Sequence, residues 1–199
     1  ETGEYSVFHL PEKINLSPKS QVRHQFVSKS SIPYENIYHI SHSLQRSRRN
    51  TAAKNENIPV YVRIELRAGD IGSFQLPGGS YKVYEQNNST LTYVGAGTST
   101  ITESTDRINL ETGKTRDILC TFIIKGYEIS RDVGEADMNA VFENRKDKTI
   151  TVVWTEKFSD GRWDIFESSS DYKRLDAFSA QFNVKIPANS KKEINFKAR

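Results

Sequence analysis

Two histidines, His39 and His42, are the first residues whose type and spacing could support chemistry, in the segment IYHISHS. A spacing of three suits two zinc ligands on one face of a helix. The flanking Ile and Tyr residues favour a strand instead, where side chains three apart point to opposite faces. No third ligand lies nearby in the sequence, and two ligands do not hold zinc. We therefore predict no metal site at this pair.

Several carboxylates and loop motifs are of types that can take part in catalysis. Glu156 and Asp164 could form a glycosidase-like pair, but both are expected to face solvent. The acidic run from Arg131 to Asp137 lacks the alternating spacing of a calcium loop. Gly113-Lys114-Thr115 has Ile108 where a phosphate-binding loop needs its first glycine, and no Gly-x-Ser-x-Gly motif occurs. We expect no catalytic residue and no cofactor.

The single cysteine, Cys120, lies within the apolar segment ILCTFII. One cysteine cannot form an intrachain disulfide, so it leaves the redox compartment open. Because free cysteines are commonly core residues, the apolar neighbours predict a buried structural thiol rather than a reactive one.

Aromatic residues are abundant, with 10 Phe, 9 Tyr and 2 Trp. Aromatic rings that face solvent offer flat surfaces on which sugar rings can stack. The candidates for such glycan stacking are Tyr81, Tyr84, Tyr93, Trp163 and Tyr172.

The charge is nearly balanced, with 28 Lys and Arg against 25 Asp and Glu, a net charge of +3. The excess lies before residue 58 and is concentrated in Arg46, Arg48 and Arg49. A nucleic-acid patch would normally combine such charge with aromatic residues or a reading element, and this segment has neither. We expect a solvated basic loop and no nucleic-acid partner, with contact to an anion or a protein partner as the alternative.

Acceptor patterns for N-glycosylation occur at Asn15, Asn87 and Asn88. They matter only if the chain passes through a eukaryotic secretory pathway.

The elements that must position these residues are strands. Val, Ile and Thr together outnumber Ala, Leu and Met, which favours pleated strands over helices. Residues 60–66 alternate apolar and polar side chains with a period of two, and residues 81–85 and 91–95 flank the turn at 87–89 as in a hairpin. No apolar run approaches the ~18–20 residues needed to span a bilayer, so we predict no transmembrane segment.

The C-terminal part shows six or seven short strands, the number and spacing of an immunoglobulin-like sandwich. In it, Ile150, Val152 and Trp154 share one face, and Phe178 and Phe182 are expected to point inward. We predict an all-β protein of two packed β-sandwich units. Residues 1–113 form an N-terminal unit, expected to be incomplete, with a long basic loop near 44–57; residues 114–199 form the immunoglobulin-like unit.

Several turn and strand motifs suggest a family. They are the LPGGSYKVY turn and strand, the L-x-x-G-x-x-x-D-I junction at 110–118, the N-R-K-D hairpin at 144–147 and the P-A-N turn at 187–189. Together they resemble the C-terminal conserved domain of the mucoidy inhibitor A-like family of bacterial envelope proteins, whose biochemistry is uncharacterised. The resemblance implies an exported protein of which this chain is the C-terminal portion, and it carries no catalytic residue. The Arg-rich insertion after Leu44 departs from the family.

From these features we expect a non-enzymatic, exported β-sandwich module with a structural, adhesive or protein-interaction role. It would act in an extracellular, periplasmic or cell-envelope location, through loops or edge strands, including self-association through edge strands. The alternative is a carbohydrate-binding module that uses exposed aromatic residues.

Overall fold

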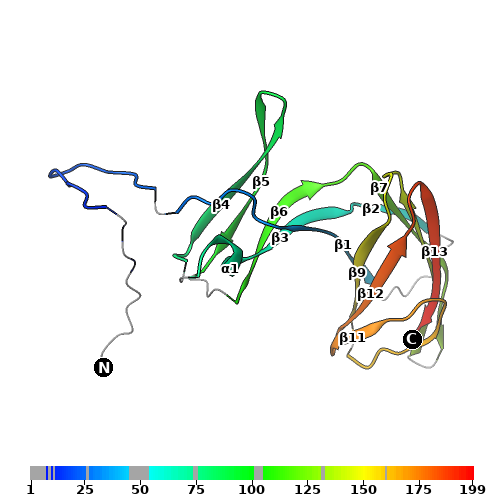
Figure 1. Ribbon diagram of the computed structural model, residues 1–199. Coiled ribbons are helices and arrows are strands. Elements are labelled where there is room, and N and C mark those ends of the chain that lie inside the picture. The colour runs from blue at the N-terminus through cyan, green and yellow to red at the C-terminus, as the bar shows by residue number, and fades with distance from the viewer. Residues whose placement is uncertain are drawn as a thin grey trace, which may run out of the picture.

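The computed structural model describes residues 8, 10, 12–25, 27–44, 54–73, 76–100, 105–130, 133–159 and 161–199. Within them the chain is all-β, as predicted, and two sheets of eight and five strands pack together as a β-sandwich (Figure 1). The only helix in these residues is the single turn α1 (Ala68–Ile71), and none is long and apolar enough to cross a membrane.

Both sheets are built almost entirely from antiparallel neighbours. Sheet A has the spatial order β11 (Lys173–Asp176), β12 (Ser179–Ile186), β9 (Ile150–Phe158), β1 (Glu35–Leu44), β3 (Tyr61–Arg67), β6 (Arg107–Lys114), β5 (Thr90–Ser99) and β4 (Gly79–Asn87). Sheet B has the order β10 (Ile165–Ser168), β13 (Ser190–Ala198), β8 (Val133–Asn144), β7 (Ile118–Ser130) and β2 (Lys54–Ile58). The pair β1 and β9 is parallel.

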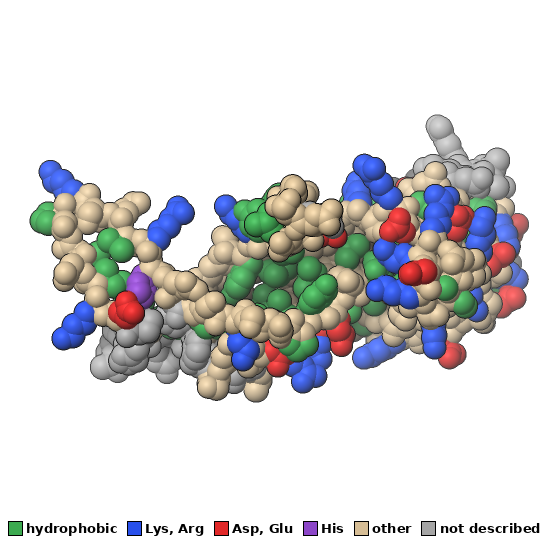
Figure 2. Space-filling view, turned by 45° about the horizontal axis from the view of Figure 1, so that its top comes forward, with side chains coloured by type: hydrophobic (Ala, Val, Ile, Leu, Met, Phe, Trp, Pro, Cys, Tyr) green, Lys and Arg blue, Asp and Glu red, His purple; other side chains and the backbone are tan. Residues whose placement is uncertain are grey.

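Sheet A has two halves with different surroundings. Strands β12, β9 and β1 pack face to face on sheet B and form the sandwich, whereas β3, β6, β5 and β4 continue beyond it (Figure 1). We call these four strands, with α1, the sheet extension. Figure 2 shows apolar side chains uncovered over the middle of the molecule, where the extension lies, and mixed charged side chains over the sandwich.

The chain passes between the sheets at two adjacent places. β2 of sheet B continues into β3 of sheet A through Pro59 and Val60, and β6 of sheet A continues into β7 of sheet B through residues 115–117. The N–H of Thr115 donates to the carbonyl of Val60 at 2.9 Å, so the two crossings are held together. β1 pairs with β9, and β2 pairs with β7. The boundary predicted at residue 113 therefore places β1 and β2 in a different unit from their partner strands in the sandwich.

The sandwich core is centred on Trp154. As the period of two predicts, Ile150, Val152 and Trp154 are all buried. The indole ring lies 4.4–5.9 Å from four phenylalanine rings, from both sheets: Phe122, Phe142, Phe182 and Phe196. This aromatic cluster joins β9 and β12 to β7, β8 and β13.

The inward placement predicted for Phe178 is wrong. Its side chain is 55% exposed, while Phe182, in the same segment, is fully buried. Phe178 lies in the turn before β12, where its N–H donates to Oδ1 of Asp176 at 2.7 Å. The alternation of strand faces therefore begins only at β12.

The extension has a small core of its own, made by Ala68, Leu76, Ile108 and Leu110. Glycines allow β5 to approach β6 closely in this part: a Cβ on Gly95 would lie 2.1 Å from the carbonyl oxygen of Glu111. Real Cβ atoms do not approach a backbone oxygen so closely, so Gly95 is required by the packing of β5 on β6.

Candidate functional site

The predicted loop and glycosylation residues fall in different parts of the chain. Arg46, Arg48 and Arg49 lie outside the described residues. Asn15 and Asn88 are exposed, and Asn88 has φ 55° in the turn between β4 and β5, while Asn87 ends β4. Of the predicted residues that the structure describes, only the sequence neighbours Asn87 and Asn88 lie together.

Two of the predicted stacking residues do meet. Tyr84 and Tyr93 are directly opposite on β4 and β5, with ring centroids 5.7 Å apart in an edge-on arrangement. They are 51% and 56% exposed, and Leu91, two residues before Tyr93, is 66% exposed. We call Tyr84, Leu91 and Tyr93 the hairpin patch. It lies on the β4–β5 hairpin, which projects from the body in Figure 1.

The other three stacking candidates, Tyr81, Tyr172 and Trp163, do not belong to the hairpin patch. Tyr81 is half-buried against the small core of the extension. Tyr172 belongs to the sandwich, where its hydroxyl donates to the carbonyl of Ile165 at 3.1 Å.

Trp163 does not face solvent, contrary to the prediction that it could stack on a sugar. Only 6% of it is exposed. One face of the indole stacks on Phe158 at 4.2 Å, the guanidinium of Arg174 lies 4.3 Å from the ring centroid, and Nε1–H donates to the carbonyl of Ala177 at 2.8 Å. Trp163 is therefore a structural residue of the sandwich.

The two histidines of β1 have separate environments, as a strand requires. His39 is near Glu111, with Nε2 3.2 Å from a carboxylate oxygen. His42 is buried, and its Nδ1 lies 2.8 Å from both carboxylate oxygens of Glu156 on β9. Among the described residues there is no group of three or more His, Cys, Asp or Glu that could hold a metal ion.

Glu156 was expected to face solvent, and this expectation is wrong: it has no exposed surface. Burial raises the pKa of its carboxyl, and the hydrogen bonds from His42, from the indole of Trp154 and from the N–H of Leu44 offset part of that rise. The indole Nε1–H donates to Oε2 at 3.1 Å, and the ring of His42 stacks on Phe122 at 4.2 Å. Such a pair, enclosed by aromatic rings, has no access for a substrate and acts as a polar link inside the core.

Cys120 is buried, as predicted, with 2% of its surface exposed. Burial raises the pKa of its thiol from 9.0 to about 12, and the negative charge of Glu156 contributes to the rise. A thiol that keeps its proton at neutral pH is a poor nucleophile.

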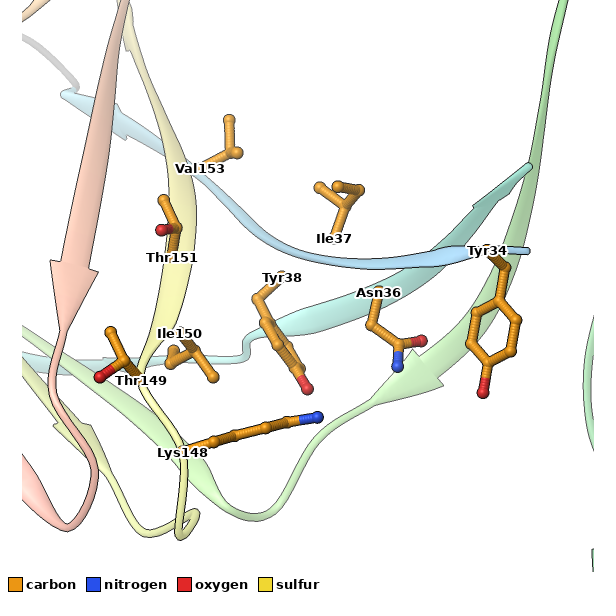
Figure 3. Close-up of a pocket in the computed structure, with 9 residues that line it drawn as sticks. All are labelled: Tyr34, Asn36, Ile37, Tyr38, Lys148, Thr149, Ile150, Thr151 and Val153. Carbon is orange, nitrogen blue, oxygen red and sulfur yellow. The ribbon is translucent and has the colours of Figure 1, made fainter. Parts of the chain in front are cut away.

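A groove opens where β1 diverges from β9 (Figure 3). Its volume is about 570 Å³. Its lining residues come from the start of β1 with the residue before it, from the turn before β9 and from the first residues of β9. They are Tyr34, Asn36, Ile37, Tyr38, Lys148, Thr149, Ile150, Thr151 and Val153. We call it the β1–β9 groove. In the view of Figure 3, Lys148 extends past the hydroxyl end of Tyr38 toward Asn36.

Sequence reasoning did not identify this groove or the buried pair. Both depend on the parallel pairing of β1 with β9, which joins segments more than 100 residues apart. A partial signal existed for the pair, since Glu156 and Trp154 share the apolar face of a strand with period two.

Comparison with known proteins gives this chain no family: it matches no protein-family model, no curated protein and no solved structure.

Proposed function

We propose that this chain is a non-enzymatic, exported β-sandwich module with an adhesive or protein-interaction role at the cell envelope or surface. The observation that carries the proposal is the hairpin patch, where three large apolar side chains on a projecting hairpin are each more than half exposed. Exposed aromatic residues on a protruding element are typical of protein contact surfaces.

The arrangement of the titratable groups supports a binding role over catalysis. Among the described residues, the most perturbed groups, Glu156 and Cys120, lie closed inside the sandwich core. A catalytic acid, base or nucleophile must reach its substrate, and these groups lie behind packed aromatic rings.

Crosslinking in the producing cell tests this proposal. A photoreactive amino acid at Leu91 is expected to give a crosslink to an envelope or surface protein, or to a second copy of the chain, in the exported fraction. The same residue placed at Lys192, an exposed position on β13 far along the chain from the hairpin, serves as the control. Retention of the chain in the cytoplasm, or equal crosslinking from both positions, would contradict the proposal.

A glycan-binding role is the second candidate, favoured by the adjacent exposed rings of Tyr84 and Tyr93. A glycan array with the intact protein and with Tyr84→Ser separates the two. Binding to a sugar that Tyr84→Ser abolishes, with no protein crosslink from Leu91, supports the glycan-binding role. If the intact protein binds no sugar on the array, the glycan-binding role is excluded.

A further inference from the structure

We propose that the β1–β9 groove binds a short extended peptide segment that pairs with the edge of β1 and presents a carboxylate to Lys148. This site is separate from the hairpin patch and does not depend on it. It is built from one strand edge, one charged side chain, one hydroxyl and side chains on both faces of the sheet.

The strand edge comes from the divergence of β1 and β9. β1 pairs with β3 from Glu35 to His39, but its pairing with β9 begins only at Tyr38, opposite Val152. Within the described part of the chain, residues 35–37 therefore have a strand partner on one side only. Three residues of strand span roughly 10 Å at ~3.3 Å per residue, enough for a few residues of an added strand, because unpaired backbone groups on such an edge accept an extended peptide.

The charge favours a carboxylate. Lys146 and Lys148 both lie at this end of β9, but Lys146 is paired with Asp117 at 2.8 Å. Lys148 is exposed and forms no side-chain ion pair within the described part of the chain. It is thus the cation that remains available to a ligand in the groove.

Tyr38 supplies the second polar group. It is only 6% exposed, lines the groove, and its hydroxyl makes no hydrogen bond to any described residue. The ammonium of Lys146 lies 5.8 Å from the centroid of its ring, which keeps the ring in place beside the groove. The hydroxyl is therefore open at the groove to a hydrogen bond with a ligand or with water.

The side chains on the two faces of the sheet match the alternation of an extended peptide. Asn36, Tyr38 and Ile150 lie on one face of the sheet, with Lys148 on the same side in Figure 3, and Ile37, Thr151 and Val153 lie on the opposite face. Since successive side chains of a strand point to opposite faces, a bound segment would direct alternate side chains toward Lys148 and Tyr38 and the others toward Ile37 and Val153.

The carboxylate could be a chain terminus or an acidic side chain, and peptide mixtures distinguish the two. The probes are N-acetylated pentapeptides randomised over Val, Ile, Thr, Ser and Tyr, prepared with a free C-terminal carboxylate, as the C-terminal amide, and as the amide with Asp or Glu at the central position. Binding is measured from the backbone amide NMR shifts of residues 35–38 and 149–151 in the intact protein. Preference for the first mixture assigns a terminal carboxylate, and preference for the third assigns a side chain. Equal binding of all three, or no shift at 1 mM peptide, overturns the proposal.

Two variants test the residues. Lys148→Gln is expected to weaken binding of the preferred mixture about tenfold, the effect of losing one charge-assisted hydrogen bond. Tyr38→Phe keeps the ring and is expected to weaken it severalfold, with an unchanged circular dichroism spectrum. Lys192→Gln, on sheet B, is the matched control and should bind as the wild type does. Loss of binding in Lys192→Gln, or none in Lys148→Gln, would contradict the site; a variant lacking the hairpin patch should still bind.

Discussion

The two halves of sheet A are covered differently. In the sandwich, β12, β9 and β1 face a second sheet, and the described part of the core between them contains 23 buried hydrophobic residues. In the sheet extension, β3, β6, β5 and β4 pack with the single turn α1, and among the described residues the core there has four buried hydrophobic residues. The strands of the two halves have similar lengths, and the second layer over the sandwich half takes more of their apolar surface out of water.

Because of this difference, one half of sheet A encloses a core and the other half presents side chains to solvent. The half with two layers holds the aromatic cluster and can enclose the polar pair of His42 and Glu156. The half with one layer leaves Tyr84, Leu91 and Tyr93 in solvent. We infer that the sandwich supports the chain and that the extension presents a surface, and the following substitutions test this contrast from the largest expected effect to the smallest.

Removing the central indole should have the largest effect. Trp154→Ala is expected to lower the free energy of unfolding by about 3–5 kcal/mol, because it opens a cavity among four phenylalanine rings. Leu110→Ala, in the small core of the extension, should cost about 2 kcal/mol, since that site can collapse toward solvent. Urea unfolding followed by circular dichroism measures both. Equal losses would refute the contrast between the two halves.

Breaking the buried pair should cost nearly as much. Glu156→Ala leaves His42 and the indole Nε1–H of Trp154 without their acceptor, and we expect a loss of about 3 kcal/mol. The double variant His42→Leu/Glu156→Leu should lose less than Glu156→Ala, because no polar group is then left unpaired. Glu128→Ala, at an exposed position of β7, is the control. A loss below about 1 kcal/mol in Glu156→Ala would show that the pair does not stabilise the core.

A methyl group at Gly95 should disturb only the extension. Gly95→Ala places a Cβ against the carbonyl of Glu111, and we expect a cost of about 2 kcal/mol as β5 moves away from β6. Gly79→Ala, where the added Cβ meets no atom within 4 Å, is the matched control. Amide hydrogen exchange should speed up in β4 and β5 and stay unchanged around Trp154. Faster exchange throughout the sandwich would mean that the two halves unfold together.

The effect that is smallest at neutral pH concerns Cys120. Because its folded pKa of about 12 lies above the ordinary 9.0, the folded protein holds the thiol proton where the unfolded chain releases it. The resulting stabilisation is complete below pH 9 and is lost as the pH rises toward 12. Cys120→Ala should therefore show a shallower fall of the unfolding free energy above pH 9. At pH 8, a thiol reagent should modify Cys120 rapidly in urea and very slowly in the native protein, and rapid native labelling would contradict its burial.

Local patterns in the sequence determined the strands and the faces that they bury. The period of two at Ile150, Val152 and Trp154 and the turn at Asn87 and Asn88 are properties of neighbouring residues, which is why they could be predicted. The same reasoning identified the buried Cys120. It was wrong for Phe178. The segment around Phe178 has the composition of a strand, but Phe178 itself lies in a turn, so the alternation of faces does not extend to it.

Tertiary structure alone decided which strands meet. The parallel pairing of β1 with β9 places His42 on Glu156, turns an acidic residue that looked solvent-facing into a core residue, and opens the groove beside Tyr38. The chain likewise crosses from sheet B to sheet A between β2 and β3. As a result β1 and β2, both from the first third of the chain, are strands of the sandwich. Pairing between distant strands depends on the packing of whole sheets, and the spacing of residues along one segment carries no information about it.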